Sequence, residues 1–158
     1  VFGNTGSGFS TMGMTWAVPD AETTDGFFAA ESSAGTGFWQ TIDVDGDGKP
    51  DLVQSGDPSR TGGYIFGAGS SSMYWKVFRN GGAGFATSAA AWIAPGSGTA
   101  DGFFGASAGS GGAWWVTQDL TGDKRADLIQ TGDPARTGGY VFGAGTAMPY
   151  WRLFKGIP

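Results

Sequence analysis

Nine consecutive residues from position 43, DVDGDGKPD, contain four carboxylates, two glycines and a proline. Asp43, Asp45 and Asp47 stand at alternate positions, so a tight loop can turn all three carboxylates toward one point. Calcium prefers roughly six to eight oxygen ligands, which come from carboxylates, backbone carbonyls and water. We therefore predict a calcium site made by Asp43, Asp45, Asp47 and Asp51, with the backbone carbonyl of Lys49 as a fifth ligand.

The glycines of this stretch support that prediction, because Gly46 and Gly48 tolerate the positive φ angles that a wrapped loop needs. An EF-hand is the rival interpretation. Its twelfth position, however, is Gln54 rather than Glu, and the flanking residues are typical of strands rather than helices. The loop is thus of the strand-loop-strand kind, and a solvated acidic turn without a metal is the alternative.

A weaker version of the same stretch, DLTGDKRAD, begins at position 119. Thr121 replaces an aspartate there and Lys124 replaces a glycine, so fewer anionic ligands are available and the affinity for calcium should be lower. Whether calcium occupies this second loop is left open. Its candidate ligands are Asp119, Thr121, Asp123, the backbone carbonyl of Arg125, and Asp127.

A second recurring set combines an acidic acceptor, an arginine and aromatic rings. Sugar hydroxyls accept and donate such hydrogen bonds, and the apolar face of a pyranose stacks on an aromatic ring. The candidate glycan-binding residues are Asp57, Arg60, Tyr64, Tyr74 and Trp75, and then Asp133, Arg136, Tyr140, Tyr150 and Trp151. In the alternative interpretation, the aspartates and arginines fix a long loop and the tryptophans fill the space between sheets.

The composition argues against several other functions. The 158 residues include no cysteine and no histidine, which removes thiol nucleophiles, serine triads and Cys-ligated zinc. Glu22 and Glu31 are the only glutamates, and the aspartates belong to loops and turns, so we expect no enzyme activity. A net charge of −5 disfavours nucleic acid, and no apolar run is long enough for membrane insertion.

The remaining sequence predicts an all-β fold. It holds 31 glycines beside many aromatic residues, and short β-type runs alternate with turn clusters. One such group of runs covers 37–42, 51–54, 74–78 and roughly 89–94, which we interpret as one four-stranded antiparallel sheet.

The chain also repeats itself with an offset of 76 residues, most clearly where DLVQSGDPSRTGGYIFGAG (51–69) falls on DLIQTGDPARTGGYVFGAG (127–145). Repeated four-stranded sheets are typical of β-propeller blades. We therefore predict a single propeller-type unit over 1–158, with repeats at 1–76 and 77–152 and a partial overlap at 153–158.

The repeat boundaries divide one predicted blade between the two ends of the sequence. Residues 29–95 supply a whole blade, 105–154 supply three strands of another, and 11–18 supply an unpaired fourth strand. Open sheet edges associate readily, so we expect copies to close a ring by strand exchange; three copies are preferred, and two or four are possible. A fragment, natural or engineered, of a longer single-chain propeller with no activity of its own explains the same boundaries, as does the start without Met.

The segments DVDGDGKPDLV and YWKVFRNGGAGF resemble the FG-GAP/VCBS repeats of integrin-α-like propellers, a family that includes propeller lectins. The resemblance covers both repeats. It implies a propeller fold with calcium in the loop between the first two strands of a blade, held by Asp43, Asp45, Asp47 and Asp51 and less securely by Asp119, Asp123 and Asp127. The long segment at 55–73 departs from these repeats, so the resemblance does not fix a ligand pocket.

Together these features predict a multivalent carbohydrate-binding protein, a lectin, built as a calcium-supported oligomeric β-propeller. The alternative from another class is a structural or adhesion module that binds protein partners. The acidic composition, the absence of cysteine and the calcium loops favour an extracellular or cell-surface location.

Overall fold

The computed structural model describes residues 5–16, 19, 39–56, 66–67, 70, 72–94, 115–132 and 141–156. Within these ranges it contains strands and no helix, as the sequence predicts. The strands are β1 (Trp39–Ile42), β2 (Asp51–Gln54), β3 (Tyr74–Phe78), β4 (Ala90–Ile93), β5 (Trp115–Gln118), β6 (Asp127–Gln130) and β7 (Arg152–Phe154).

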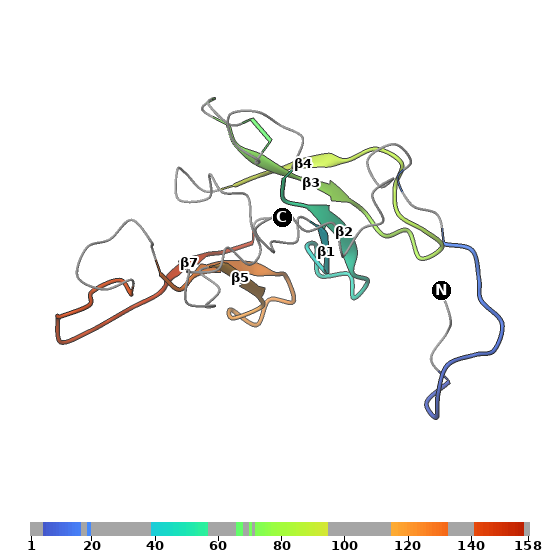
Figure 1. Ribbon diagram of the computed structural model, residues 1–158, viewed down its shortest axis with the longest axis horizontal. Coiled ribbons are helices and arrows are strands. Elements are labelled where there is room, and N and C mark those ends of the chain that lie inside the picture. Colours follow the sequence, from blue (N-terminus) through green and yellow to red (C-terminus); the bar gives the residue numbers. More distant parts are fainter. Residues whose placement is uncertain are drawn as a thin grey trace, which may run out of the picture.

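The strands form two antiparallel sheets, which appear as separate layers in Figure 1. The first sheet has the order β1-β2-β3-β4, and the second has the order β5-β6-β7. Corresponding strands pair in the same register: Ile42 lies opposite Asp51 in the first sheet, and Gln118 lies opposite Asp127 in the second. Each acidic loop therefore closes a hairpin between the first two strands of its sheet.

The prediction of an all-β chain with one four-stranded and one three-stranded sheet is confirmed. The closed propeller and the ring of copies stay predictions. The segment expected as an unpaired strand is described only at 11–16, where it belongs to no strand. Residues 5–16, blue in Figure 1, extend away from both sheets.

The central strands β2 and β6 are buried along their whole length, because each lies between two neighbouring strands and its faces are covered. The main apolar cluster joins the two sheets, so they share one core. Its buried members are Ile42, Val44, Val53, Trp75, Val77, Ala94, Ala126 and Leu128. A smaller cluster of Trp39, Leu52 and Phe78 lies within the first sheet.

The link that enters β3 turns at a glycine that no other residue could replace without strain. Gly67 has φ +73°, and an added Cβ would collide with the carbonyl oxygen of Ser72. Just beyond it, Phe66 pairs with Tyr74 and their rings stack at 5.7 Å. The second sheet repeats this device with Phe142 and Tyr150, whose rings stack at 5.6 Å.

Candidate metal centre and the cavity between the sheets

The loop 43–51 is wrapped around its first aspartate. The carboxylate of Asp43 accepts the backbone N–H of Gly46 at 2.8 Å and that of Gly48 at 2.9 Å. Both glycines have positive φ, +79° and +85°, as the sequence predicts. This wrapping brings Asp43, Asp45 and Asp51 together, and one oxygen from each lies within 4.8 Å of the others.

These three carboxylates are close enough to hold a metal ion. Two oxygens on opposite sides of a calcium ion lie about 4.6–5.2 Å apart, given bonds of about 2.3–2.6 Å, so the observed spacing fits a hard cation of that size. An all-oxygen anionic set is also the set that calcium prefers over zinc or copper. The residues present thus fit the ion that the sequence indicates.

Asp51 is the buried member of the group. One of its oxygens accepts the backbone N–H of Asn80 at 2.8 Å, and the other accepts that of Val44 at a long 3.4 Å. Burial raises the pKa of the Asp51 carboxyl; those two donors work against the rise, and the charge of Asp45 adds to it. The negative charge of Asp51 is therefore poorly compensated by the protein alone.

A basic side chain from β3's end lies at the same group. Arg79 forms an ion pair with Asp45, and its Nη1 lies 3.8 Å from Asp51 Oδ2. The guanidinium thus occupies the position where a cation would meet these two carboxylates. Binding of a metal to the group requires Arg79 to move aside or to share the carboxylates.

Asp47, the third predicted carboxylate, is turned to another partner. Its oxygens accept the backbone N–H and the Nζ of Lys49, at 2.8 and 2.7 Å. The hydrogen bond from the Lys49 side chain is the main cause that lowers the pKa of Asp47. Asp47 is not part of the three-carboxylate group, and its role as a ligand, like that of the Lys49 carbonyl, stays a prediction.

The second loop starts in the same way but closes differently. Asp119 accepts the N–H groups of Gly122 at 2.7 Å and Lys124 at 2.8 Å, as Asp43 does with its glycines. Asp123 forms an ion pair with Lys155 at 3.3 Å. Of the residues that the structure describes, those of 119–127 form no three-carboxylate group.

The last aspartate of this loop is fully enclosed by donors. Asp127 accepts backbone N–H groups of Leu120, Thr121 and Gly156, each at 3.0 Å. Burial raises the pKa of Asp127, but these three N–H groups and the Thr121 hydroxyl outweigh it, so the pKa lies below its usual value. Thr121 therefore acts here as a donor to Asp127, which is a different role from the predicted metal ligand.

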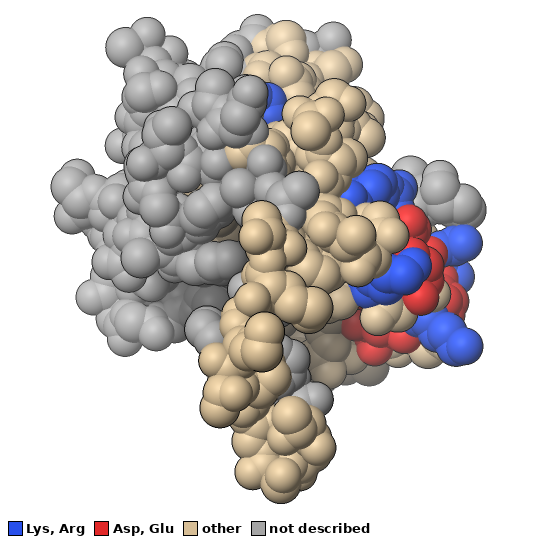
Figure 2. Space-filling view, turned by 90° about the vertical axis from the view of Figure 1, so that its right-hand side faces the viewer, with Lys and Arg blue, Asp and Glu red and all other residues tan. Residues whose placement is uncertain are grey.

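The two acidic loops lie side by side, although 76 residues separate them in the sequence. Arg125 donates its Nε–H to the carbonyl oxygen of Asp45 at 3.4 Å, and the Ala126 N–H reaches the carbonyl oxygen of Asp43 at 3.3 Å. Most charged side chains visible in Figure 2 gather in one area, with blue and red atoms next to one another. Each loop thus adds to the electrostatic environment of the other.

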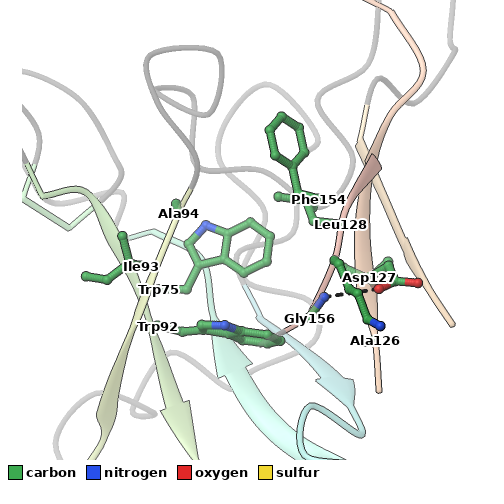
Figure 3. A pocket seen from close by; sticks show the side chains of 11 residues that line it. Trp75, Trp92, Ile93, Ala94, Ala126, Asp127, Leu128, Phe154 and Gly156 are labelled. Carbon is green, nitrogen blue, oxygen red and sulfur yellow. Dashed lines mark hydrogen bonds between the residues drawn. The ribbon is translucent and has the colours of Figure 1, made fainter. Parts of the chain in front are cut away.

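A cavity of about 360 Å³ opens between the two sheets (Figure 3). One side is formed by Trp75 and Trp92, whose rings meet edge to face at 6.4 Å. The second sheet contributes Phe154 across from them, and Thr117 and Lys155 add a hydroxyl and an ammonium group. Aromatic walls with a few polar groups are typical of small-ligand sites.

The structure describes four of the ten predicted glycan-binding residues. Trp75 is buried in the shared core and also lines the cavity. Tyr74 is half-buried against Phe66, whereas Tyr150 and Trp151 are exposed. The remaining candidates, Asp57, Arg60, Tyr64, Asp133, Arg136 and Tyr140, lie outside the described residues.

Three residues at the two sites have no counterpart in the sequence predictions: Arg79, Lys155 and Trp92. Arg79 and Lys155 stand 76 residues apart, each after a phenylalanine, so the repeat itself contained the signal. Their proximity to the acidic loops depends on the pairing of the second and third strands, which brings distant residues together. Trp92 is recognisable only once β4 is placed against β3.

No family model, curated protein or solved structure matches the chain. In the described part, no helix has both the length and the apolar character needed to cross a membrane.

Proposed function

We propose that the chain is a carbohydrate-binding protein, a lectin, whose sheets are stabilised by calcium at the loop 43–51. The observation that supports sugar binding is the cavity between the sheets, where Trp75 and Trp92 face Phe154. A pyranose ring offers an apolar face to such aromatic rings and presents hydroxyls at its edge. Thr117 and Lys155 would supply hydrogen-bond partners for those hydroxyls.

Calcium would serve the fold rather than the sugar. Asp43, Asp45 and Asp51 would hold it, and its charge would compensate the buried carboxylate of Asp51. The ion would tie the β1–β2 hairpin to the end of β3, because the Asp51 carboxylate also accepts the N–H of Asn80. Calcium loops of this open type bind in the range of extracellular calcium, which supports an extracellular setting.

A glycan array tests the sugar proposal, followed by inhibition with the free sugar. Thr117→Val should weaken binding at least about fivefold, because it removes a hydroxyl from the cavity and leaves its shape almost unchanged. Thr15→Val is the matched control, since Thr15 is exposed and outside the cavity. The double variant Arg60→Ala with Arg136→Ala tests the site that the sequence predicts.

The array also separates the proposal from its rival, an adhesion module that binds proteins. Sugar-inhibitable binding that responds to Thr117→Val supports a lectin with its site between the sheets. Binding that responds only to the arginine variants moves the site to the predicted loops. A folded chain that binds no glycan on a broad array overturns the lectin proposal and favours the adhesion module.

A further inference from the structure

The second sheet ends in an edge strand that differs from its counterpart in the first sheet. In the first sheet β3 has two neighbours, β2 and β4, whereas within the described residues β7 pairs with β6 alone. Trp75 and Val77 of β3 are 5% and 2% exposed. Trp151 and Leu153, 76 residues later, are 61% and 47% exposed. An apolar face and an open row of backbone groups thus remain uncovered at β7.

The same repeat identifies a segment that fits this edge. Residues 14–16, Met-Thr-Trp, stand 76 positions before 90–92, Ala-Ala-Trp, which lie within β4. The described residues 11–16 belong to no strand, and Met14 is 59% exposed. The chain therefore contains one strand-like segment outside a sheet and one sheet without its fourth strand.

We propose that residues 14–16 of a second copy add to β7 as the fourth strand of its sheet. The register follows from the observed pairing of β3 with β4, in which Trp75 lies opposite Trp92 and Val77 opposite Ala90. The equivalent pairs are Met14 with Leu153, Thr15 with Arg152 and Trp16 with Trp151. Directly opposite residues of an antiparallel pair share one face of the sheet, so the exposed apolar side chains of both segments meet.

The partner is a second copy because the segment lies beside the other sheet of its own chain. The ring of Trp16 is held edge-on at 6.1 Å from Phe85, which follows β3. In Figure 1 the blue segment and β7 lie on opposite sides of the chain. Strand addition to an open edge also needs no rearrangement of the acceptor sheet, since the backbone groups of β7 already point outward.

Donor segment and acceptor edge are different surfaces, so the contact is heterologous. Each copy can give its segment to one neighbour and receive a segment from another, until the chain of copies closes on itself. This inference does not depend on sugar binding, because neither surface belongs to the cavity between the sheets.

Light scattering of the full chain, coupled to size exclusion over a range of concentrations, tests the contact. The unaltered chain should elute above its 16.2 kDa monomer mass. Met14→Lys and Leu153→Lys should each weaken association at least about tenfold, because each places a charge in an apolar contact. Met12→Lys is the control, since Met12 is exposed but aligns with Ser88, outside β4. Circular dichroism should show the same strand content for all of them.

Mixing the two variants tests the donor and acceptor roles directly. The Met14→Lys chain keeps an intact β7, and the Leu153→Lys chain keeps an intact segment. Together they should form a one-to-one dimer of twice the 16.2 kDa chain mass, although each alone is a monomer. A wild-type monomer at every concentration overturns the proposal. So does equal weakening by Met12→Lys, or a mixture that stays monomeric.

Discussion

The loops 43–51 and 119–127 handle their first aspartate alike and their last aspartate differently. Asp43 and Asp119 each accept two backbone N–H groups of the following turn, with distances of 2.7–2.9 Å. At the other end, Asp51 has one short and one long N–H contact, whereas Asp127 has three at 3.0 Å. The pKa of Asp51 is raised and that of Asp127 is lowered.

One substitution between the loops explains most of this difference. Asp45 in the first loop places a second charge beside Asp51, whereas Thr121 at the same position supplies an N–H and a hydroxyl to Asp127. The first loop accumulates charge that an external cation can neutralise. The second loop neutralises its buried charge with its own backbone, so a metal would add little there.

The largest expected effect is that of calcium on stability. A free calcium concentration about a hundredfold above the dissociation constant stabilises a protein by about 2.7 kcal/mol, or about 5–10 °C in Tm for a chain of this size. Chelation should remove that gain. Asp45→Ala should abolish most of the calcium response and Thr121→Ala should leave it intact, as followed by thermal unfolding. A Tm that ignores the chelator contradicts the metal site.

The next effect separates the two buried aspartates without calcium. Asp127→Asn replaces an acceptor of three N–H groups by one that also donates, so buried N–H groups lose their partner at a cost of about 1–3 kcal/mol. Asp51→Asn should cost less than Asp127→Asn, because it also removes a charge that burial disfavours. Chemical denaturation in chelator measures both. Equal losses would mean that the two environments do not differ as their hydrogen bonds indicate.

Arg79 gives a smaller effect that sharpens the comparison. Its guanidinium lies at Asp45 and Asp51 and competes with an external cation. Arg79→Ala should therefore increase calcium affinity about fivefold in isothermal titration, as expected from removing a nearby positive charge. Lys155→Ala is the matched control, because Lys155 pairs with Asp123 of the second loop. Weaker calcium binding by Arg79→Ala would show that Arg79 supports the site instead.

The sequence predicted the hairpins well because their signals are local. Alternating β-type residues, glycine turns and the 76-residue offset were sufficient to place β1 to β7 and to expect the turn at Gly46 and Gly48. The environment of Asp51 was not predictable in this way. It depends on Arg79 and Asn80, which strand pairing brings from about thirty residues away.

The same reason explains why the cavity was only partly foreseen. Trp75 was a candidate from its aromatic character, but the opposite wall comes from Phe154 and Lys155 on the other sheet. No local pattern states how two sheets face each other. Thr121 shows a further limit: a residue can occupy a ligand position in an aligned motif and yet serve as a hydrogen-bond donor.

The smallest expected effect concerns backbone strain at one matched position. Gly48 has φ +85°, and its counterpart Lys124 has φ +70°, although a side chain makes that conformation costly by about 1–2 kcal/mol. Lys124→Gly should relieve this strain, partly offset by the greater freedom of glycine in the unfolded chain, for a net gain of about 0.5–1 kcal/mol. Gly48→Ala should instead destabilise by about 1 kcal/mol, and an added Cβ there meets no neighbour, so the loss comes from φ alone. Denaturation midpoints of the two variants should therefore move in opposite directions; movement in the same direction would mean that the turns are not equivalent.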